Sequence, residues 1–193
     1  MNKSLMQEAL GDAWEQLPPG LRCHYAAGTT TTDIGHMDVE FPPFMRPLLW
    51  VLSKLGALVQ RKGRQVPTTV VKTVVGKRQI WCRTLQFSTG PAEQFNSFWV
   101  LHGDKQLIEY VNPWLGLQMS VEVRDGRLLY HGVRFVVRMG RCLLPIPESL
   151  ALGHTTIEER CTGENSFAMD FRLTHPLLGQ VFRYSGEFES VAG

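Results

Sequence analysis

From residue 67 to residue 190 the sequence is a succession of short segments with β-strand character, separated by turns. The segments are rich in Val, Thr and aromatic residues, and Asp125-Gly126 is typical of a two-residue type I′ hairpin turn. Strands joined by short turns pair antiparallel. The predicted strands are 68–75, 79–87, 94–101, 106–111, 116–123, 127–138, 155–161, 167–173 and 180–188. This spacing predicts a strongly curved antiparallel sheet, or an open β-barrel, of about nine strands.

Within several of these strands apolar and polar residues alternate, as in Phe167, Met169, Phe171 and Leu173 against the residues between them. Alternation with a period of two builds a sheet with one dry and one wet face. The predicted dry face is unusually aromatic, and most aromatic residues of this kind belong to a core. The aromatic residues that we expect to line a ligand space are Trp81, Phe95, Trp99, Phe135, Phe171, Phe182 and Tyr184.

Two helices are predicted in the N-terminal half, which makes the fold class α+β. Apolar residues recur at helical spacing over 4–16, and Pro18, Pro19 and Gly20 end this helical region, residues 1–20. After a Thr-rich extended segment, 29–41, a strongly apolar helix is predicted over 43–62. We expect this helix to be gripped by the sheet, with Leu48, Leu52 and Leu55 turned inward. The length of 193 residues suits a single domain, 1–193.

The few polar residues of the second helix are basic, and Arg61, Lys62 and Arg64 follow at its end. An apolar helix with a basic edge serves as a core helix, as a lid over a cavity, or as an element on an anionic membrane surface. We expect Trp50 to join the ligand-lining residues. We expect Arg61, Lys62 and Arg64 to lie at the mouth of that space, where they would meet an anionic headgroup or the membrane.

Composition excludes several classes of protein. A net charge of +2 gives no reason to expect a nucleic-acid partner. The N-terminus has no apolar run that would make a secretory signal, and no stretch is long and apolar enough to span a membrane. Cys23, Cys82, Cys142 and Cys161 are too far apart for a zinc motif, and we expect reduced thiols, buried or half-buried. The expected location is the cytoplasm, including the inner face of the membrane.

No catalytic signature is present. There is no Gly-rich phosphate loop or nucleophile motif. His36, Asp38 and Glu40 share one face of a predicted strand, as metal ligands can, but a solvated strand face gives the same pattern. We therefore predict no metal and no cofactor, and we favour a non-enzymatic role.

The Pro, Gly and aromatic motifs of the chain resemble those of one bacterial family. The resemblance rests on Leu17-Pro18-Pro19-Gly20-Leu21 after Trp14, Val66-Pro67-Thr68-Thr69-Val70, Trp81-Cys82-Arg83, Leu144-Pro145-Ile146-Pro147, and Pro176-Leu177-Leu178-Gly179 with Tyr184-Ser185-Gly186. The family is domain of unknown function 4166, and the resemblance covers nearly the whole chain. It implies an accessory or binding domain near metabolic enzymes of the epimerase or dehydrogenase type, which this chain would meet in trans. It supplies no catalytic residues.

These observations predict a protein that binds an apolar or amphipathic small molecule, such as a lipid or fatty acyl group, between helix and curved sheet. One alternative is an interaction module for a dehydrogenase-like or epimerase-like partner, which would expose an apolar patch. The other is a hydrolase or isomerase for a hydrophobic substrate, for which His102, His131, Glu158 and Asp170 are the first candidates. An apolar cavity favours binding, polar groups in contact with it favour catalysis, and no cavity favours a partner surface.

Overall fold

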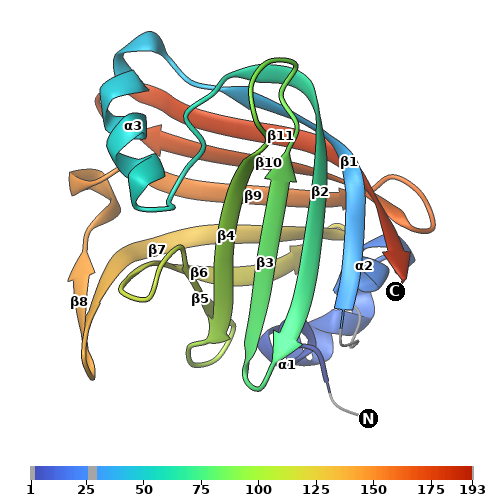
Figure 1. Ribbon diagram of the computed structural model, residues 1–193. Helices are drawn as coiled ribbons and strands as arrows, with labels where there is room; N and C mark the ends of the chain where they lie inside the picture. Colours follow the sequence, from blue (N-terminus) through green and yellow to red (C-terminus); the bar gives the residue numbers. More distant parts are fainter. Residues whose placement is uncertain (1–2, 26–29, 193) are drawn as a thin grey trace.

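The computed structural model describes residues 3–25 and 30–192 (Figure 1). Its helical elements are short and lie in the N-terminal half, apart from one turn near residue 148. They are α1 (Leu5–Leu10), η1 (Gly11–Gln16), α2 (Pro19–His24), η2 (Pro43–Met45), α3 (Arg46–Lys54) and η3 (Glu148–Leu150). The strands are β1 (Thr30–Glu40), β2 (Gly63–Val75), β3 (Arg78–Leu85), β4 (Glu93–Leu101), β5 (Gln106–Tyr110), β6 (Leu115–Arg124), β7 (Arg127–Met139), β8 (Cys142–Ile146), β9 (His154–Cys161), β10 (Ser166–His175) and β11 (Gly179–Ala192).

The predicted curved sheet is confirmed, and it closes into a barrel. Ten antiparallel strands follow the order β6-β5-β4-β3-β2-β1-β11-β10-β9-β7, and pairing of β6 with β7 completes the ring. The nine predicted strands are all present, and the Thr-rich segment supplies the tenth as β1, between β2 and β11. The eleventh strand, β8, pairs only with the second half of β7 and lies outside the ring. It lies between two of the predicted strands, 127–138 and 155–161, in a segment for which no strand was predicted.

The Asp125-Gly126 hairpin is also confirmed. Both residues have positive φ, 52° and 71°, as a type I′ turn requires. The turn joins β6 to β7, the two strands whose pairing closes the barrel. A short local signal therefore fixes the register at the closing seam.

The N-terminal helices cover one end of the barrel, and α3 lies at the other (Figure 1). Ser4 caps α1 through a capping box with Gln7, which explains the helix start. The Pro-Pro-Gly sequence ends the first helical segment as predicted, but Pro19 then begins α2, a helix that the sequence analysis missed. Gly20 lets α2 pack closely against the β9–β10 hairpin, because a Cβ atom there would lie 2.5 Å from the Gly163 carbonyl oxygen. This packing carries His24 and Tyr25 into the barrel interior.

The second predicted helix is shorter than expected and is turned differently. It runs through η2 and α3, from Pro43 to Lys54, and lies across the barrel end. Leu49 is fully buried, whereas Leu48 is 42% exposed, and Leu52 and Leu55 are half-buried. The expectation that Leu48 faces the sheet is therefore wrong. A helix that covers an open barrel end buries only a narrow stripe of its side chains. Within α3 this stripe passes through Leu49.

The orientation of α3 gives a direct test. Leu49→Ala should lower the free energy of unfolding by about 2–3 kcal/mol, since it removes a fully buried side chain from the barrel end. Leu48→Ala, one residue earlier and exposed, should change it by less than about 0.5 kcal/mol. Urea denaturation of the two variants measures both values. Equal losses would contradict this orientation of α3.

Within the described ranges, none of the helices combines the length and the apolar character needed to cross a membrane.

Candidate functional site

An apolar cavity of about 160 Å³ lies inside the barrel at the α3 end. Leu52, Ala57 and Leu58 contribute to it from α3 and the segment that follows. The remaining lining comes from β4 to β8, β10 and β11 and from the segment after η3: Phe95, Glu109, Val111, Leu115, Gly116, Leu117, Phe135, Ile146, Ala151, Leu152, Phe171, Leu173 and Tyr184. Every one of these residues except Glu109 and Tyr184 is apolar or Gly. An enclosure of this kind favours an apolar guest.

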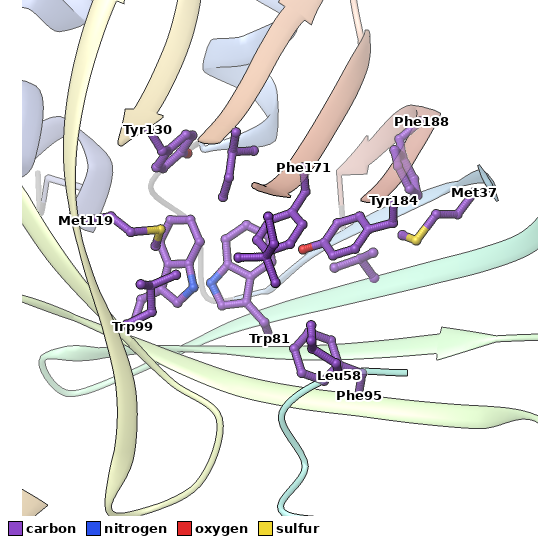
Figure 2. Packing of buried hydrophobic residues seen from close by; sticks show 14 of the residues in the cluster. Met37, Leu58, Trp81, Phe95, Trp99, Met119, Tyr130, Phe171, Tyr184 and Phe188 are labelled. Carbon is purple, nitrogen blue, oxygen red and sulfur yellow. The ribbon is translucent and has the colours of Figure 1, made fainter. Parts of the chain in front are cut away.

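Most of the aromatic residues singled out from the sequence point into the barrel. Phe95, Phe135, Phe171 and Tyr184 line the apolar cavity. Figure 2 shows aromatic side chains approaching one another from two facing walls, with Trp81, Phe95 and Trp99 on one wall and Phe171 and Tyr184 on the other. Trp81 and Trp99 lie deeper, and Phe182 is fully buried beside Tyr184.

Trp50 is placed elsewhere. Its side chain is 57% exposed, as are Phe44 and Val51 to a similar degree, and it does not line the cavity. The cause is the rotation of α3, which gives the inward position to Leu49. An exposed apolar face with Arg46 and Lys54 remains, and the hypotheses of membrane or partner contact rest on this face.

The basic cluster does not line the apolar cavity, unlike its expected position at the cavity mouth. Arg61, Lys62 and Arg64 line a separate surface groove with residues 86–89. The Arg61 guanidinium lies 4.2 Å from the Phe87 ring centre and donates hydrogen bonds to the carbonyl oxygens of Thr89 and Pro91. These contacts hold the cation on the β3–β4 connection.

At its inner end the apolar cavity meets a buried ion pair that the sequence analysis did not identify. Arg83 Nη2 lies 3.1 Å from Glu109 Oε1, and Ser97 Oγ donates to the same oxygen at 2.6 Å. The Arg83 guanidinium also lies about 5 Å from the ring centres of Trp81 and Phe95. These side chains occupy inward positions of β3, β4 and β5, so regular alternation brings them together.

A second, smaller cavity of about 30 Å³ lies deeper in the barrel. It shares Glu109 and Tyr184 with the apolar cavity, and its other polar lining residues are His24, Asp33, Trp81, Arg83, Trp99 and Glu159. The rings of Trp81 and Trp99 stack with centres 4.6 Å apart. Both indole Nε1 atoms are buried and lack a hydrogen-bond partner among the described residues.

Beside this inner cavity, three charged or titratable side chains form a buried cluster. Asp33 Oδ2 lies 2.9 Å from both Lys72 Nζ and His24 Nδ1, and Ser190 donates to Asp33 at 2.7 Å. Burial lowers the pKa of His24 to about 4, although the Asp33 carboxylate opposes this, so the ring is neutral at pH 7. Burial alone would raise the pKa of Asp33, but His24 and Lys72 outweigh it and lower the pKa to about 2.

Glu159 faces the same interior from β9, together with two tyrosines. Tyr25 donates to the Glu159 carboxyl group at 2.8 and 2.9 Å, and its hydroxyl contacts that of Tyr130. Burial raises the pKa of Glu159 to about 8, more than the Tyr25 hydrogen bond lowers it. Glu159 is therefore mostly protonated and uncharged at neutral pH. Its neighbour Glu158 points to the outer face, because successive side chains of a strand alternate between its two faces.

The polar residues proposed first for catalysis lie outside the barrel. His102, His131 and Glu158 are partly exposed, and Asp170 pairs with Arg172 and Arg183 in an outer groove of about 510 Å³. That groove is larger than the interior cavities, but it is open to solvent, and its Asp170, Arg172 and Arg183 side chains are paired with one another. His36 and Asp38 line it too, and nowhere in the described ranges do three His, Cys, Asp or Glu side chains gather as they would around a metal ion. The four cysteines are free, and three of them are exposed, not buried as expected.

We expected an apolar cavity to favour binding and polar groups in contact with it to favour catalysis. The outer and inner cavities differ in this respect. The outer cavity is apolar, which favours binding. Polar groups do line the inner cavity, but its volume is near that of one water molecule, so it admits a single polar group and not the body of a ligand. Among the described residues, the outer cavity is thus the better candidate site.

Comparison with known proteins places the chain in a family. Residues 17–188 match Domain of unknown function (DUF4166), which is nearly the whole chain of 193 residues. The chain belongs to this family, as the Pro, Gly and aromatic motifs of the sequence indicated. Searches of curated proteins and of solved structures found no match.

Proposed function

We propose that this member of the DUF4166 family binds an apolar small molecule inside its barrel, with the ligand body in the cavity at the α3 end. The observation that carries the proposal is the enclosure of about 160 Å³ whose lining is apolar apart from Glu109 and Tyr184. Unfilled apolar volume is costly in a protein interior, since its lining atoms lack contacts. A guest of matching size restores those contacts.

The cavity size limits the ligand. A cavity of about 150 Å³ lined by apolar side chains accommodates one benzene molecule. The present cavity therefore suits one ring or a short chain. A long fatty acyl group would enter by its end only and leave the rest of its chain beyond Leu52 and Ala57. We accordingly favour a compact apolar body over a complete lipid tail.

Ethylbenzene tests the proposal. It should bind saturably, raise the melting temperature by mass action, and change the tryptophan fluorescence through Trp81 and Trp99. Ala57→Phe fills the cavity from the α3 side and should lower ethylbenzene affinity at least tenfold while the fold is kept. The matched control is Ala92→Phe, an exposed position that does not line the cavity. No saturable signal from wild type, or equal binding by Ala57→Phe, would refute the proposed function.

A further inference from the structure

The inner cavity contains hydrogen-bond donors that have no acceptor. Seven buried side-chain polar atoms lack partners among the described residues, and four of them belong to His24, Asp33, Trp81 and Trp99, which all line this cavity. Asp33 still has ion-pair contacts at 2.9 Å, whereas the two indole N–H groups have none. A buried donor without an acceptor costs about 1–3 kcal/mol, so such groups normally mark the place of a water molecule or a ligand atom.

The geometry suits an acceptor carried by the ligand of the outer cavity. A volume of about 30 Å³ admits one water-sized group, such as a carbonyl or hydroxyl oxygen. The two cavities have Tyr184 and Glu109 in common. The Tyr184 ring stacks on Phe171 with centres 4.4 Å apart and lines both cavities, so a ligand that spans them contacts this ring.

The charges of the interior determine which acceptor fits. Arg83 is neutralised by Glu109, and Lys72 by Asp33. Glu159 and His24 are both uncharged at neutral pH. No unmatched positive charge is left among these side chains, and burying an unpaired carboxylate there would be strongly unfavourable. The acceptor is therefore neutral.

We propose that Trp81 and Trp99 recognise a neutral hydrogen-bond acceptor, a carbonyl or hydroxyl oxygen, at the end of the apolar ligand. The indole N–H groups donate to this oxygen in the inner cavity while the ligand body occupies the outer one. The inference rests on the proposed function and adds the chemical class of the ligand: a compact, uncharged molecule with one polar end.

Three probes of similar size test this class. Acetophenone carries a carbonyl group, ethylbenzene lacks an acceptor, and benzoate is an anion. The readout is the indole N–H signals of the five tryptophans in a ¹H–¹⁵N correlation spectrum of the labelled protein. Trp81→Phe and Trp99→Phe assign two of these signals by their loss. Trp114→Phe is the matched control, because Trp114 is 43% exposed and lines neither cavity.

Acetophenone should shift the Trp81 and Trp99 signals saturably and leave those of Trp14, Trp50 and Trp114 in place. Trp81→Phe and Trp99→Phe should each lower acetophenone affinity about 3–10-fold, as expected for one neutral hydrogen bond. Their affinity for ethylbenzene should stay within about twofold, and benzoate should bind wild type at least tenfold more weakly than acetophenone does.

Two different failures are distinguishable. If ethylbenzene binds but acetophenone leaves both indole signals unmoved, the inner cavity holds water only and this inference is wrong, while the proposed function stands. Tighter binding of benzoate than of acetophenone would likewise overturn the neutral class. If neither ethylbenzene nor acetophenone binds, the proposed function fails and this inference fails with it.

Discussion

Asp33→Ala should lower the free energy of unfolding by about 3–5 kcal/mol, because it leaves the Lys72 ammonium buried without its carboxylate. Both side chains are almost completely inaccessible to solvent, so water cannot replace the lost partner. Chemical denaturation at pH 7 measures the loss. Glu40→Ala on the outer face of the same strand removes only a partly exposed pairing with Arg183 and should cost less than about 1 kcal/mol.

A double mutant separates the free-energy cost of the unpaired Lys72 charge from the cost of lost packing. Lys72→Met keeps an apolar side chain of similar length and removes the charge that Asp33→Ala would leave buried without a partner. The double variant Asp33→Ala, Lys72→Met should therefore be more stable than the sum of the two single losses predicts, by about 1–3 kcal/mol. Strict additivity would show that Asp33 and Lys72 do not interact in the folded protein.

The stability of the wild type should also depend on pH through Glu159. Burial raises its pKa from the ordinary value of 4.5 to about 8, so the unfolded chain releases this proton near pH 4.5 and the folded chain near pH 8. The stabilising contribution is complete below pH 4.5 and is lost as the pH rises to 8. His24 acts in the opposite sense, since its contribution is present above pH 6.5 and is lost as the pH falls through 4.

Between pH 6.5 and 8 the effect of Glu159 is therefore separated from that of His24. At about 1.4 kcal/mol per pKa unit, the free energy of unfolding should fall by about 2 kcal/mol across this window. Glu159→Gln keeps an acceptor oxygen for Tyr25 and does not titrate, so its stability should be flatter by that amount. Urea denaturation of both proteins from pH 6 to 8.5 gives the comparison, which also removes contributions common to both, including that of Lys72. Parallel curves would show that Glu159 does not hold its proton.

The strand and turn signals of this chain are local, and they determined most of the architecture. Alternation in residues 167–173 and the Asp125-Gly126 turn depend on neighbours in sequence, so the sequence predicted both the curved sheet and its dry aromatic face. The Thr-rich segment was assigned as extended, but its position between β2 and β11 depends on pairings far along the chain. Closure of the ring could not be inferred, because the Asp125-Gly126 turn predicts only the pairing of β6 with β7, whereas the pairing of β7 with β9 depends on how far the sheet curves.

The polar interior was decided by the tertiary structure alone. Asp33 and Lys72 are charged residues on predicted strands, and the ordinary expectation places such residues in water. In the barrel Asp33 is buried while the adjacent Ile34 is 53% exposed, because His24 and Lys72 come from segments 9 and 39 residues away in the chain to neutralise it. A single sequence carries no signal for a partner that distant.

Two of the corrected expectations, the direction of α3 and the position of the basic cluster, have the same origin. The sequence predicted an apolar helix over residues 43–62, but its end at Lys54 and the direction of its buried stripe, through Leu49 and not through Trp50, depend on the barrel end beneath it. It determined that Arg61 is basic, but the position of this cation on Phe87 and the β3–β4 connection depends on a contact across the fold. Local propensity and periodicity fix which elements form, whereas the cavities and the charges around them arise only where ten strands and three helices meet.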